Sequence, residues 1–330
     1  MRVLVTGATG FIGSNVVKKL IEAGFEVNAL IRESSNKLNI RGLPLEIFYG
    51  DLRNKESLKK AIKGCKGLFH VAASYSFWSP YPGEFYETNV EGTKNIIQAA
   101  AEAGVYKIVY TSSESTIKIS GNGKLGCEGE MSNLYELAGD YKRSKLLAEM
   151  EVLEFCKRNY PIVIVNPTTP IGSGDIKPTP TGKIVLDFLN GKIPAYVNTG
   201  LNIIDVEDVA LGHLLAFEKG KIGERYLLGN KNLSLKQILE IIAGITGMNP
   251  PKVQIPLWLA MTAAYIDEFI SGKILKKHPA IPVAAVKTAR KFRYFDCSKA
   301  IYELGLPQTS VEIAFEKSIK WFRENGYVKN

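Results

Sequence analysis

The chain has 330 residues, of which 45% are hydrophobic and 23% are charged. This is the composition of an ordinary globular protein, and it excludes disordered, collagen-like and low-complexity chains. At about 150 residues per domain, the length predicts two domains, or one domain with a large appendage. The formal net charge of +9 favours anionic ligands. The sequence contains no nucleic-acid-binding motif and no dense basic stripe with aromatic residues, so we expect no nucleic-acid partner.

Cysteine and histidine are both scarce, with four and three residues respectively. Their spacing matches no zinc site, so we expect no metal centre. Free thiols, and a first strand that begins at the N-terminus without a signal-peptide pattern, favour a cytoplasmic location. No uncharged stretch reaches the roughly 18 apolar residues that a membrane-spanning helix requires.

The first half of the chain alternates short apolar strands with helices. Strand patterns lie at Arg2–Thr6, Val27–Ile31, Leu45–Tyr49, Gly67–Val71, Lys107–Thr111 and Pro161–Asn166. Helix patterns lie at Phe11–Ala23, Lys55–Ile62, Glu84–Ala103 and Asp140–Asn159. This alternation indicates parallel βαβ units and therefore an α/β fold with a doubly wound parallel sheet.

The pattern changes after Asn166. Residues Pro167–Gly182 are rich in Pro, Gly and Thr and predict a long functional loop rather than sheet. One further strand and five helices are expected at Arg225–Leu228, Asp208–Glu218, Leu235–Ile245, Leu257–Leu275, Val283–Lys291 and Val311–Asn325. We therefore divide the chain into a nucleotide-binding domain, residues 1–166, and a smaller, mostly helical substrate cap, residues 167–330. Some segments of the cap are expected to return to the first domain.

A glycine-rich loop joins the first strand to the first helix. Glycines at such a place let the backbone approach a pyrophosphate, where free N–H groups and the helix dipole favour anions. The strand before the loop and the helix after it favour this interpretation over a plain glycine turn. The loop predicts a Rossmann-type domain that binds NAD or NADP through Gly7, Thr9, Gly10, Phe11, Ile12 and Gly13.

The end of the second strand indicates which dinucleotide is bound. Proteins that bind NAD usually carry an acidic residue there, which holds the ribose 2′-hydroxyl. Here Ile31 stands at that place and Arg32 follows it, and a guanidinium suits a 2′-phosphate. We predict NADP, with NAD as the alternative because Glu33 is adjacent. Further cofactor contacts are expected after the third and fourth strands, at Asp51, Leu52, Ala72 and Ala73.

A second motif carries acid–base chemistry. Tyr141 is the only one of the 15 tyrosines with a lysine four residues later, Lys145. On a helix these two side chains share one face, and an ammonium together with a nicotinamide cation would lower the pKa of the phenol toward neutrality. The hydroxyl cluster Thr111–Ser113 ends the fifth strand, where sites form in open α/β sheets. We expect Ser113 to hydrogen-bond a substrate oxygen, although a turn or a helix cap is the alternative for any one hydroxyl.

In this order the motifs resemble the extended short-chain dehydrogenase/reductase superfamily, also called the NAD-dependent epimerase/dehydratase family. The resemblance covers nearly the whole chain and rests on TGATGFIG at Thr6–Gly13, NVEGT around Asn89, TSS at Thr111–Ser113 and YKRSK at Tyr141–Lys145. It implies a catalytic triad of Ser113, Tyr141 and Lys145, with Lys145 also holding the cofactor ribose. It further implies that Asn166 and Pro167 border the nicotinamide and that Asn89 supports the site structurally. A homodimer through the helices at Glu84–Ala103 and Asp140–Asn159 is also typical of the family.

Two segments resemble particular groups of this family. The ends of the second and sixth strands are similar to those of dihydroflavonol 4-reductases, and Ile176–Ala210 is similar to bacterial proteins called hopanoid-associated sugar epimerases. Members that act on nucleotide sugars usually have an arginine, which holds the phosphates, shortly before the V-[DE]-D-V-A motif. Leu201 stands at that position here. This departure favours a less charged ketone or aldehyde, or a sugar without the nucleotide.

Three functions remain open at this point. The preferred one is an NADP-dependent oxidoreductase that interconverts a ketone or aldehyde and an alcohol. The second is a sugar epimerase or dehydratase that uses tightly bound NAD(P) without net redox change. The third is a non-catalytic NADPH-sensing protein, against which the complete triad argues.

An apolar segment begins at Trp258 and is followed by Lys273, Lys276 and Lys277. A buried core with a solvated basic face is the simplest interpretation of this segment. Contact with an anionic membrane surface is the alternative.

Overall fold

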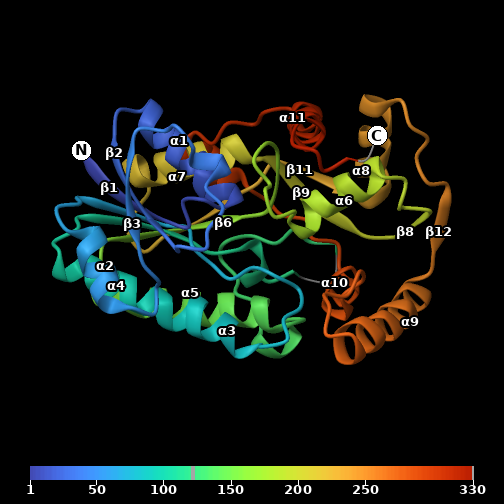
Figure 1. The fold of residues 1–330 in the computed structure, drawn as a ribbon, viewed down its shortest axis with the longest axis horizontal. Coiled ribbons are helices and arrows are strands. Elements are labelled where there is room, and N and C mark those ends of the chain that lie inside the picture. The colour runs from blue at the N-terminus through green and yellow to red at the C-terminus, as the bar shows by residue number, and fades with distance from the viewer. Residues whose placement is uncertain (120–122, 329–330) are drawn as a thin grey trace.

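The computed structural model describes residues 1–119 and 123–328. A seven-stranded sheet crosses the centre of the molecule (Figure 1). Its strands are β1 (Arg2–Thr6), β2 (Glu26–Ile31), β3 (Leu45–Tyr49), β4 (Gly67–His70), β5 (Lys107–Thr111), β6 (Ile162–Pro167) and β10 (Arg225–Leu228). The spatial order is β10-β6-β5-β4-β1-β2-β3, and all neighbours are parallel. The order reverses between β1 and β4, the kind of switch point at which doubly wound sheets bind ligands.

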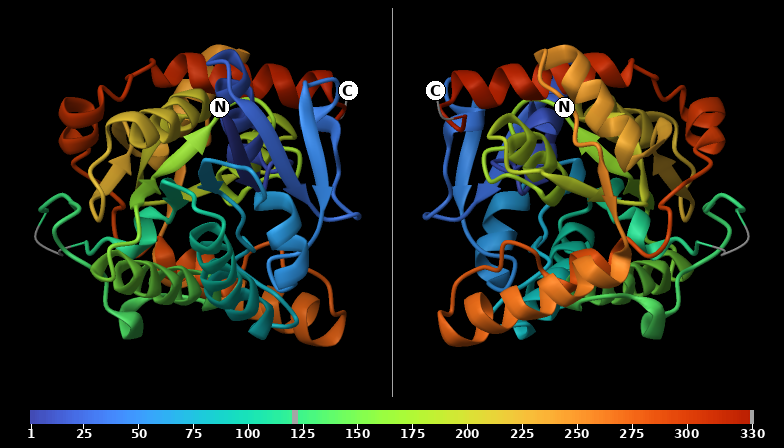
Figure 2. Two further views of the ribbon diagram at one scale, coloured as in Figure 1. Left: turned by 90° about the vertical axis from the view of Figure 1, so that its left-hand side faces the viewer. Right: turned by 90° about the vertical axis from the view of Figure 1, so that its right-hand side faces the viewer.

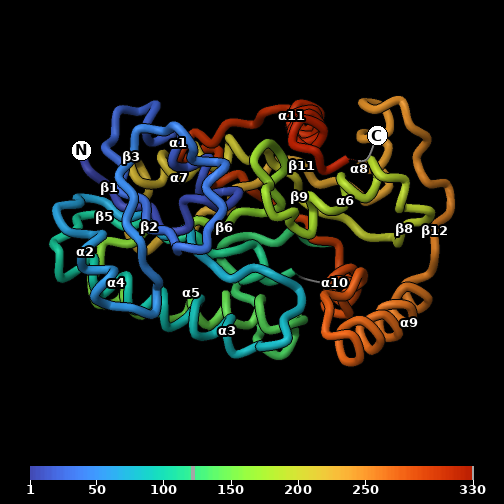
Figure 3. The backbone as a smooth tube through the Cα atoms, viewed as in Figure 1, coloured from blue at the N-terminus to red at the C-terminus, as the bar shows by residue number. Residues whose placement is uncertain are grey.

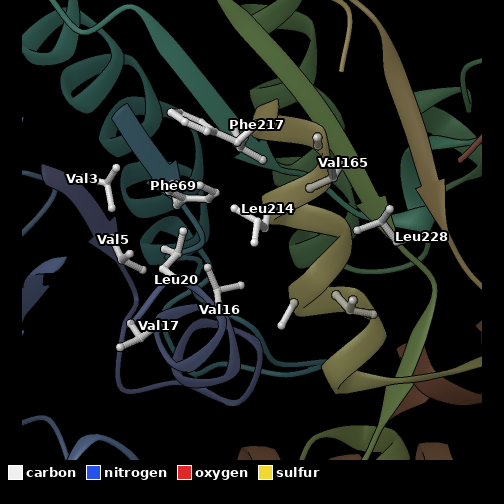
Figure 4. Close-up of a cluster of buried hydrophobic side chains, with 14 of the residues drawn as sticks. Val3, Val5, Val16, Val17, Leu20, Phe69, Val165, Leu214, Phe217 and Leu228 are labelled. Atoms are coloured by element: carbon white, nitrogen blue, oxygen red, sulfur yellow. The ribbon is translucent and has the colours of Figure 1, made fainter. Parts of the chain in front are cut away.

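Helices cover both faces of the sheet, and successive strand residues point to opposite layers. α1 (Phe11–Glu22) and α7 (Val206–Lys219) cover one face. Figure 4 shows Leu20 of α1 and Phe217 of α7 packed around Phe69 of β4. Leu4 of β1 points the other way, into a second core beneath α2 (Lys55–Ile62), α4 (Gly92–Glu102) and α5 (Asp140–Lys157). Both faces are buried, which explains why these strands are almost continuously apolar. The predicted doubly wound α/β fold is confirmed.

The rest of the chain forms a smaller body beyond the carboxyl ends of the strands (Figures 1 and 2). It contains two small sheets, β11-β9-β7 and β12-β8. Their strands are β7 (Thr169–Ile171), β8 (Ala195–Val197), β9 (Gly200–Asp205), β11 (Lys231–Ser234) and β12 (Val253–Ile255). Its helices are α6 (Pro180–Leu189), α8 (Leu235–Thr246), α9 (Leu257–Asp267), α10 (Val283–Thr288) and α11 (Val311–Glu324). Although they follow residue 166, β10 and α7 belong to the layers of the main sheet.

The prediction of a loop over Pro167–Gly182 is wrong in part. Pro167 ends β6, residues Thr169–Ile171 form β7, and α6 begins at Pro180. Pro170 is tolerated because β7 lies at the edge of its sheet, where the N–H that proline lacks is not needed. The Thr179 side chain accepts a hydrogen bond from the Gly182 N–H and so caps α6.

The long helix predicted over Glu84–Ala103 is interrupted. It consists of α3 (Gly83–Tyr86), a π-helical turn η2 (Glu87–Glu91) and α4. The helix predicted over Leu257–Leu275 likewise continues beyond α9 as a π-helical segment, η5 (Glu268–Ile274). Figure 3 traces the backbone from β12 into α9 at the right-hand side of the molecule. Within the described residues, no helix is both long and apolar enough to cross a bilayer.

Candidate active site

The glycine loop packs as tightly as dinucleotide binding requires. Gly7 has φ +71°, and a Cβ there would lie 2.7 Å from the Ala72 Cα. A Cβ on Gly13 would overlap the Gly7 carbonyl oxygen. Gly10 caps α1 without a side-chain partner, so the N–H groups of the first helical turn remain for an anionic ligand. The residues present therefore fit a pyrophosphate at this helix N-terminus.

Five further predicted cofactor residues follow the carboxyl ends of β2, β3 and β4: Arg32, Asp51, Leu52, Ala72 and Ala73. Arg32 is exposed directly after β2. Asp51 is engaged in a bidentate pair with Arg53, at 2.9 and 3.0 Å, and this pair holds the pKa of the Asp51 carboxyl below its usual value. The amide of Asn39 donates to the Thr9 carbonyl at 3.4 Å and to the Gly174 carbonyl at 2.7 Å. Asn39 therefore ties the segment after β2 to the glycine loop, a role that no motif indicated.

Ser113 and Tyr141 meet at the same edge of the sheet. Ser113 follows β5 and Tyr141 lies in the first turn of α5. Burial raises the pKa of Tyr141, a hydrogen bond with Ser113 acts in the opposite direction, and Glu114 adds to the increase. The lowered pKa expected for this phenol is thus not present in the protein alone, because desolvation outweighs the hydrogen bond.

Lys145 lies one helical turn beyond Tyr141 and is buried. Its Nζ donates to the Thr111 carbonyl at 2.8 Å and to the Tyr110 hydroxyl at 3.3 Å. Burial lowers the pKa of Lys145 to about 8, and the nearby Glu149 carboxylate opposes this decrease. The ammonium is therefore fixed at the end of β5 by its contacts with Thr111 and Tyr110.

Asn89 joins the two sides of the site. Its Oδ1 accepts from the Ser74 N–H at 2.8 Å, and its Nδ2 donates to the Ser144 hydroxyl at 2.9 Å. The π-helical turn around Asn89 places the amide between the loop after β4 and helix α5. These contacts fit the structural role that the resemblance implies.

Asn166 lies behind Ser113. Its Nδ2 donates to the Ser113 carbonyl at 3.2 Å and to Glu149 Oε2 at 2.8 Å. The side chain is fully buried, so its direct contacts support the Ser113 turn. Because the Asn166 side chain is engaged in this way, the prediction that Asn166 and Pro167 border the nicotinamide now concerns only their backbone atoms, and it stays a prediction.

Sequence reasoning missed two buried ion pairs that surround the triad. Glu149 Oε1 and Arg225 Nε lie 2.8 Å apart, and Glu114 pairs with Arg293. It also missed Lys142, which donates to the Thr288 hydroxyl of α10 at 2.9 Å. Burial and the Arg293 charge lower the pKa of Lys142 to about 7. Glu114 and Lys142 directly follow the predicted catalytic residues Ser113 and Tyr141, so their places in the sequence could have indicated them. No local motif in the sequence could have indicated the two arginines.

Two aromatic rings pack against the ring of Tyr141. The ring centroids of Tyr75 and Tyr141 lie 4.6 Å apart, and those of Phe85 and Tyr141 lie 6.5 Å apart. These rings come from the loop after β4 and from α3. They cover part of the Tyr141 ring, which agrees with desolvation being the largest influence on the pKa of its phenol. Among the residues that the structure describes, no three His, Cys, Asp or Glu side chains gather to hold a metal ion.

A Rossmann-type sheet with a glycine loop, a Ser/Tyr pair and a buried lysine defines an NAD(P)-dependent enzyme. The chain belongs to the NAD dependent epimerase/dehydratase family, whose sequence model matches residues 3–229.

Three similar proteins cover almost the whole chain. The "Putative dihydroflavonol 4-reductase" of Synechocystis sp. is 48% identical over 98% of this chain and 95% of its own. The "Sterol demethylase protein B" of Methylococcus capsulatus is 34% identical over 99% of this chain and its whole length. The crystal structure of gox2253 is 42% identical, has a TM-score of 0.88, and covers 99% of both chains. The family therefore includes both reductase-like and sterol-related relatives of this chain.

Proposed function

We propose that this protein is an NADP-dependent oxidoreductase that interconverts a ketone or aldehyde and an alcohol, with Ser113, Tyr141 and Lys145 as catalytic residues. The observation that carries the proposal is the meeting of Ser113 and Tyr141 beside the glycine-loop edge, with Lys145 buried one turn away. The similarity to a reductase-like protein over nearly the full length supports it. When bound, the nicotinamide supplies or accepts the hydride.

The chain's own residues handle the oxygen and the proton. Ser113 and Tyr141 bind the carbonyl oxygen, and Tyr141 gives its proton to the oxygen as the alcohol forms. The raised pKa of Tyr141 keeps the phenol protonated at neutral pH, as reduction requires. Lys145 holds the ribose and places a positive charge near the phenol, which favours phenolate in the reverse direction.

We assign NADP rather than NAD on account of Arg32. Its exposed guanidinium follows β2 and is close enough to Asp51 to contribute to the low pKa of that carboxyl. A 2′-phosphate beside this strand end would find a cation and no acidic residue in the position that NAD prefers.

One observation supports a sugar epimerase as the second candidate. Leu201, which replaces the family's phosphate-holding arginine, forms a backbone bridge with Arg293. The buried guanidinium of Arg293 therefore belongs to a residue that neighbours position 201, where the family's arginine is absent. The Arg293 Nε has no hydrogen-bond partner among the described residues. Glu114 already pairs with the Arg293 Nη2, so the Nε is the part of this guanidinium left to meet a polar or anionic substituent on the substrate.

We also propose three broader properties. Residues 167–330 supply most of the substrate-binding part, and helices η2, α4 and α5 form a homodimer interface. The four unpaired cysteines support a reducing, cytoplasmic location.

Replacement of Tyr141 tests the proposed function. We expect Tyr141→Phe to lower kcat for NADPH-dependent carbonyl reduction by about 100-fold or more, because the proton donor is lost. The Kd for NADPH should change less than about twofold, since the triad tyrosine is not the main anchor of the dinucleotide. Tyr86→Phe is the matched control: it removes a phenol on α3 that donates to Asp140. Substantial residual activity of Tyr141→Phe would reject the assigned role.

A further inference from the structure

Helix α9 and its extension η5 carry large apolar side chains on two opposite faces. The inner face packs on α10, where Met261 and Ala264 lie against Val283 and Val286. The outer face is open to solvent: Trp258 is 68% exposed, Phe269 is 56% exposed and Ile274 is 61% exposed. Tyr265, Ile266 and Leu275 are exposed on the same segment. Figure 1 places α9 at the outer edge of the molecule, beyond α10 and far from the main sheet.

An outer face of this kind indicates a missing contact. A helix that is apolar all round is normally buried on every side. Contiguous exposed apolar surface on this scale marks an interaction site, whereas singly scattered apolar residues do not. The spacing of Trp258, Tyr265 and Phe269 follows a helical stripe, and the exposed Ile270 lies next to Phe269. These side chains form one surface, which we call the α9 face.

The charges around the α9 face show what kind of partner it fits. Lys273, Lys276 and Lys277 follow the stripe and are exposed, and within the described residues none of them pairs with a carboxylate. The two nearby acids are used internally. Asp267 accepts from the Ile281 N–H and Glu268 accepts from the Val283 N–H. With three lysines against two acids, residues 257–278 carry a net positive charge.

We propose that the α9 face docks onto an anionic lipid bilayer. Its aromatic and aliphatic side chains would enter the boundary between headgroups and acyl chains, while the three lysines contact the headgroups. Among the described residues no helix is long and apolar enough to cross a bilayer, so the segment would lie in the interface. A second copy of the chain fits less well, because a twofold contact would bring two lysine clusters together.

The α9 face is also connected to the candidate active site. His278, just after η5, lies 3.2 Å from the Ser76 hydroxyl and 5.7 Å from the Trp78 ring. In the same loop, Tyr75 packs on Tyr141. A docked bilayer would therefore lie beside the loop that covers the catalytic tyrosine. Bilayer binding itself does not depend on the reaction assigned to Tyr141, so the two proposals succeed or fail separately.

Co-sedimentation with vesicles tests the docking. We expect the full-length protein to bind phosphatidylcholine vesicles that contain phosphatidylglycerol, and to bind phosphatidylcholine alone at least tenfold more weakly. Ile270→Asp should weaken binding at least tenfold, because it puts a charge into the apolar surface. The matched control is Ile313→Asp on α11: Ile270 is 46% exposed and Ile313 is 44% exposed. The control should bind as the unchanged protein does.

Two further measurements keep the result unambiguous. Lys273→Glu/Lys276→Glu/Lys277→Glu should abolish the preference for the anionic lipid, and Trp258 fluorescence should shift to the blue on vesicle addition. Light scattering shows whether a second copy of the chain, rather than a bilayer, covers the α9 face. Absence of vesicle binding, equal loss in Ile270→Asp and Ile313→Asp, or a dimer that Ile270→Asp dissociates without any lipid binding would each overturn the proposal. NADPH-dependent turnover of a water-soluble carbonyl compound should be the same in Ile270→Asp and the unchanged protein.

Discussion

Residue burial sets the protonation of the groups on the first turns of α5. Desolvation raises the pKa of Tyr141 and lowers those of Lys142 and Lys145 to about 7 and about 8. Glu149 and Glu114 each oppose the decrease at one lysine. The same dry environment therefore keeps the phenol protonated and brings both lysines close to neutral pH, where small changes in charge alter their protonation.

We propose that Arg32 determines the preference for NADP over NAD. We expect Arg32→Gln to raise the Kd for NADPH about 10- to 100-fold, because a charged hydrogen bond contributes roughly 1.5–3 kcal/mol. The Kd for NADH should change less than about twofold. Isothermal titration with both nucleotides measures this, with the exposed Arg41→Gln as control. Equal losses for NADPH and NADH would contradict the assignment.

At the scale of elements, the junction of β1, the glycine loop and α1 is the most tightly constrained part of the fold. Gly10 N–H donates to the Gly7 carbonyl at 2.9 Å, and the same carbonyl leaves no room for a Cβ at residue 13. The close approach lets α1 pack on β1 and directs its N-terminus toward the switch point of the sheet.

Two glycine substitutions separate this constraint from ordinary helix propensity. Gly13→Ala should lower the free energy of unfolding by roughly 1–3 kcal/mol or more and abolish NADPH binding, because the added methyl group overlaps the backbone. Gly244→Ala lies in α8 with open space around it and should stabilise the protein by up to about 1 kcal/mol. Urea denaturation measures both. A neutral Gly13→Ala would show that the close packing is not required.

The sequence predicted elements best where one local pattern determines them. β1, β3, β5 and α2 have the predicted bounds, because each is a short apolar or amphipathic segment between turn residues. The strands β7, β8, β9, β11 and β12 were missed. β9 contains the buried Asn202, whose amide donates to Asn232 on the facing strand β11, so tertiary contacts rather than periodicity stabilise it.

The same reasoning applies to the candidate site. The glycine loop and the Tyr141–Lys145 spacing are local motifs and were found. Arg225 and Arg293 reach Glu149 and Glu114 from segments about 75 to 180 residues away. Such pairs depend on the packing of the whole chain and leave no periodic or spacing signal.

At the scale of the molecule, two buried histidines link the layers of the fold. His70 contacts the hydroxyls of Thr6 and Thr93, at 2.7 and 2.9 Å, so β1, β4 and α4 meet at its ring. His213 on α7 contacts the Thr111 hydroxyl at 2.9 Å. Burial lowers the pKa of His70 to about 3 and that of His213 to about 4. His70 thus has the structural environment of a hydrogen-bonded core residue.

These histidines predict loss of stability in acid. Between pH 6.5 and about 4 the folded protein binds fewer protons than the unfolded chain, so the free energy of unfolding falls as the pH falls. From pH 6 to pH 5 the two histidines should remove roughly 2 kcal/mol. His213→Gln should reduce this pH dependence by about half, measured by urea denaturation at several pH values. An unchanged slope in His213→Gln would exclude its contribution.

The cofactor content of freshly purified protein distinguishes an oxidoreductase from an epimerase. A reductase must exchange its dinucleotide in every turnover, whereas an epimerase recycles one bound molecule. We expect mass spectrometry to find little bound dinucleotide, and added NADPH to bind more tightly than NADH. Abundant, tightly held and mostly oxidised NAD would contradict the oxidoreductase assignment and favour internal recycling.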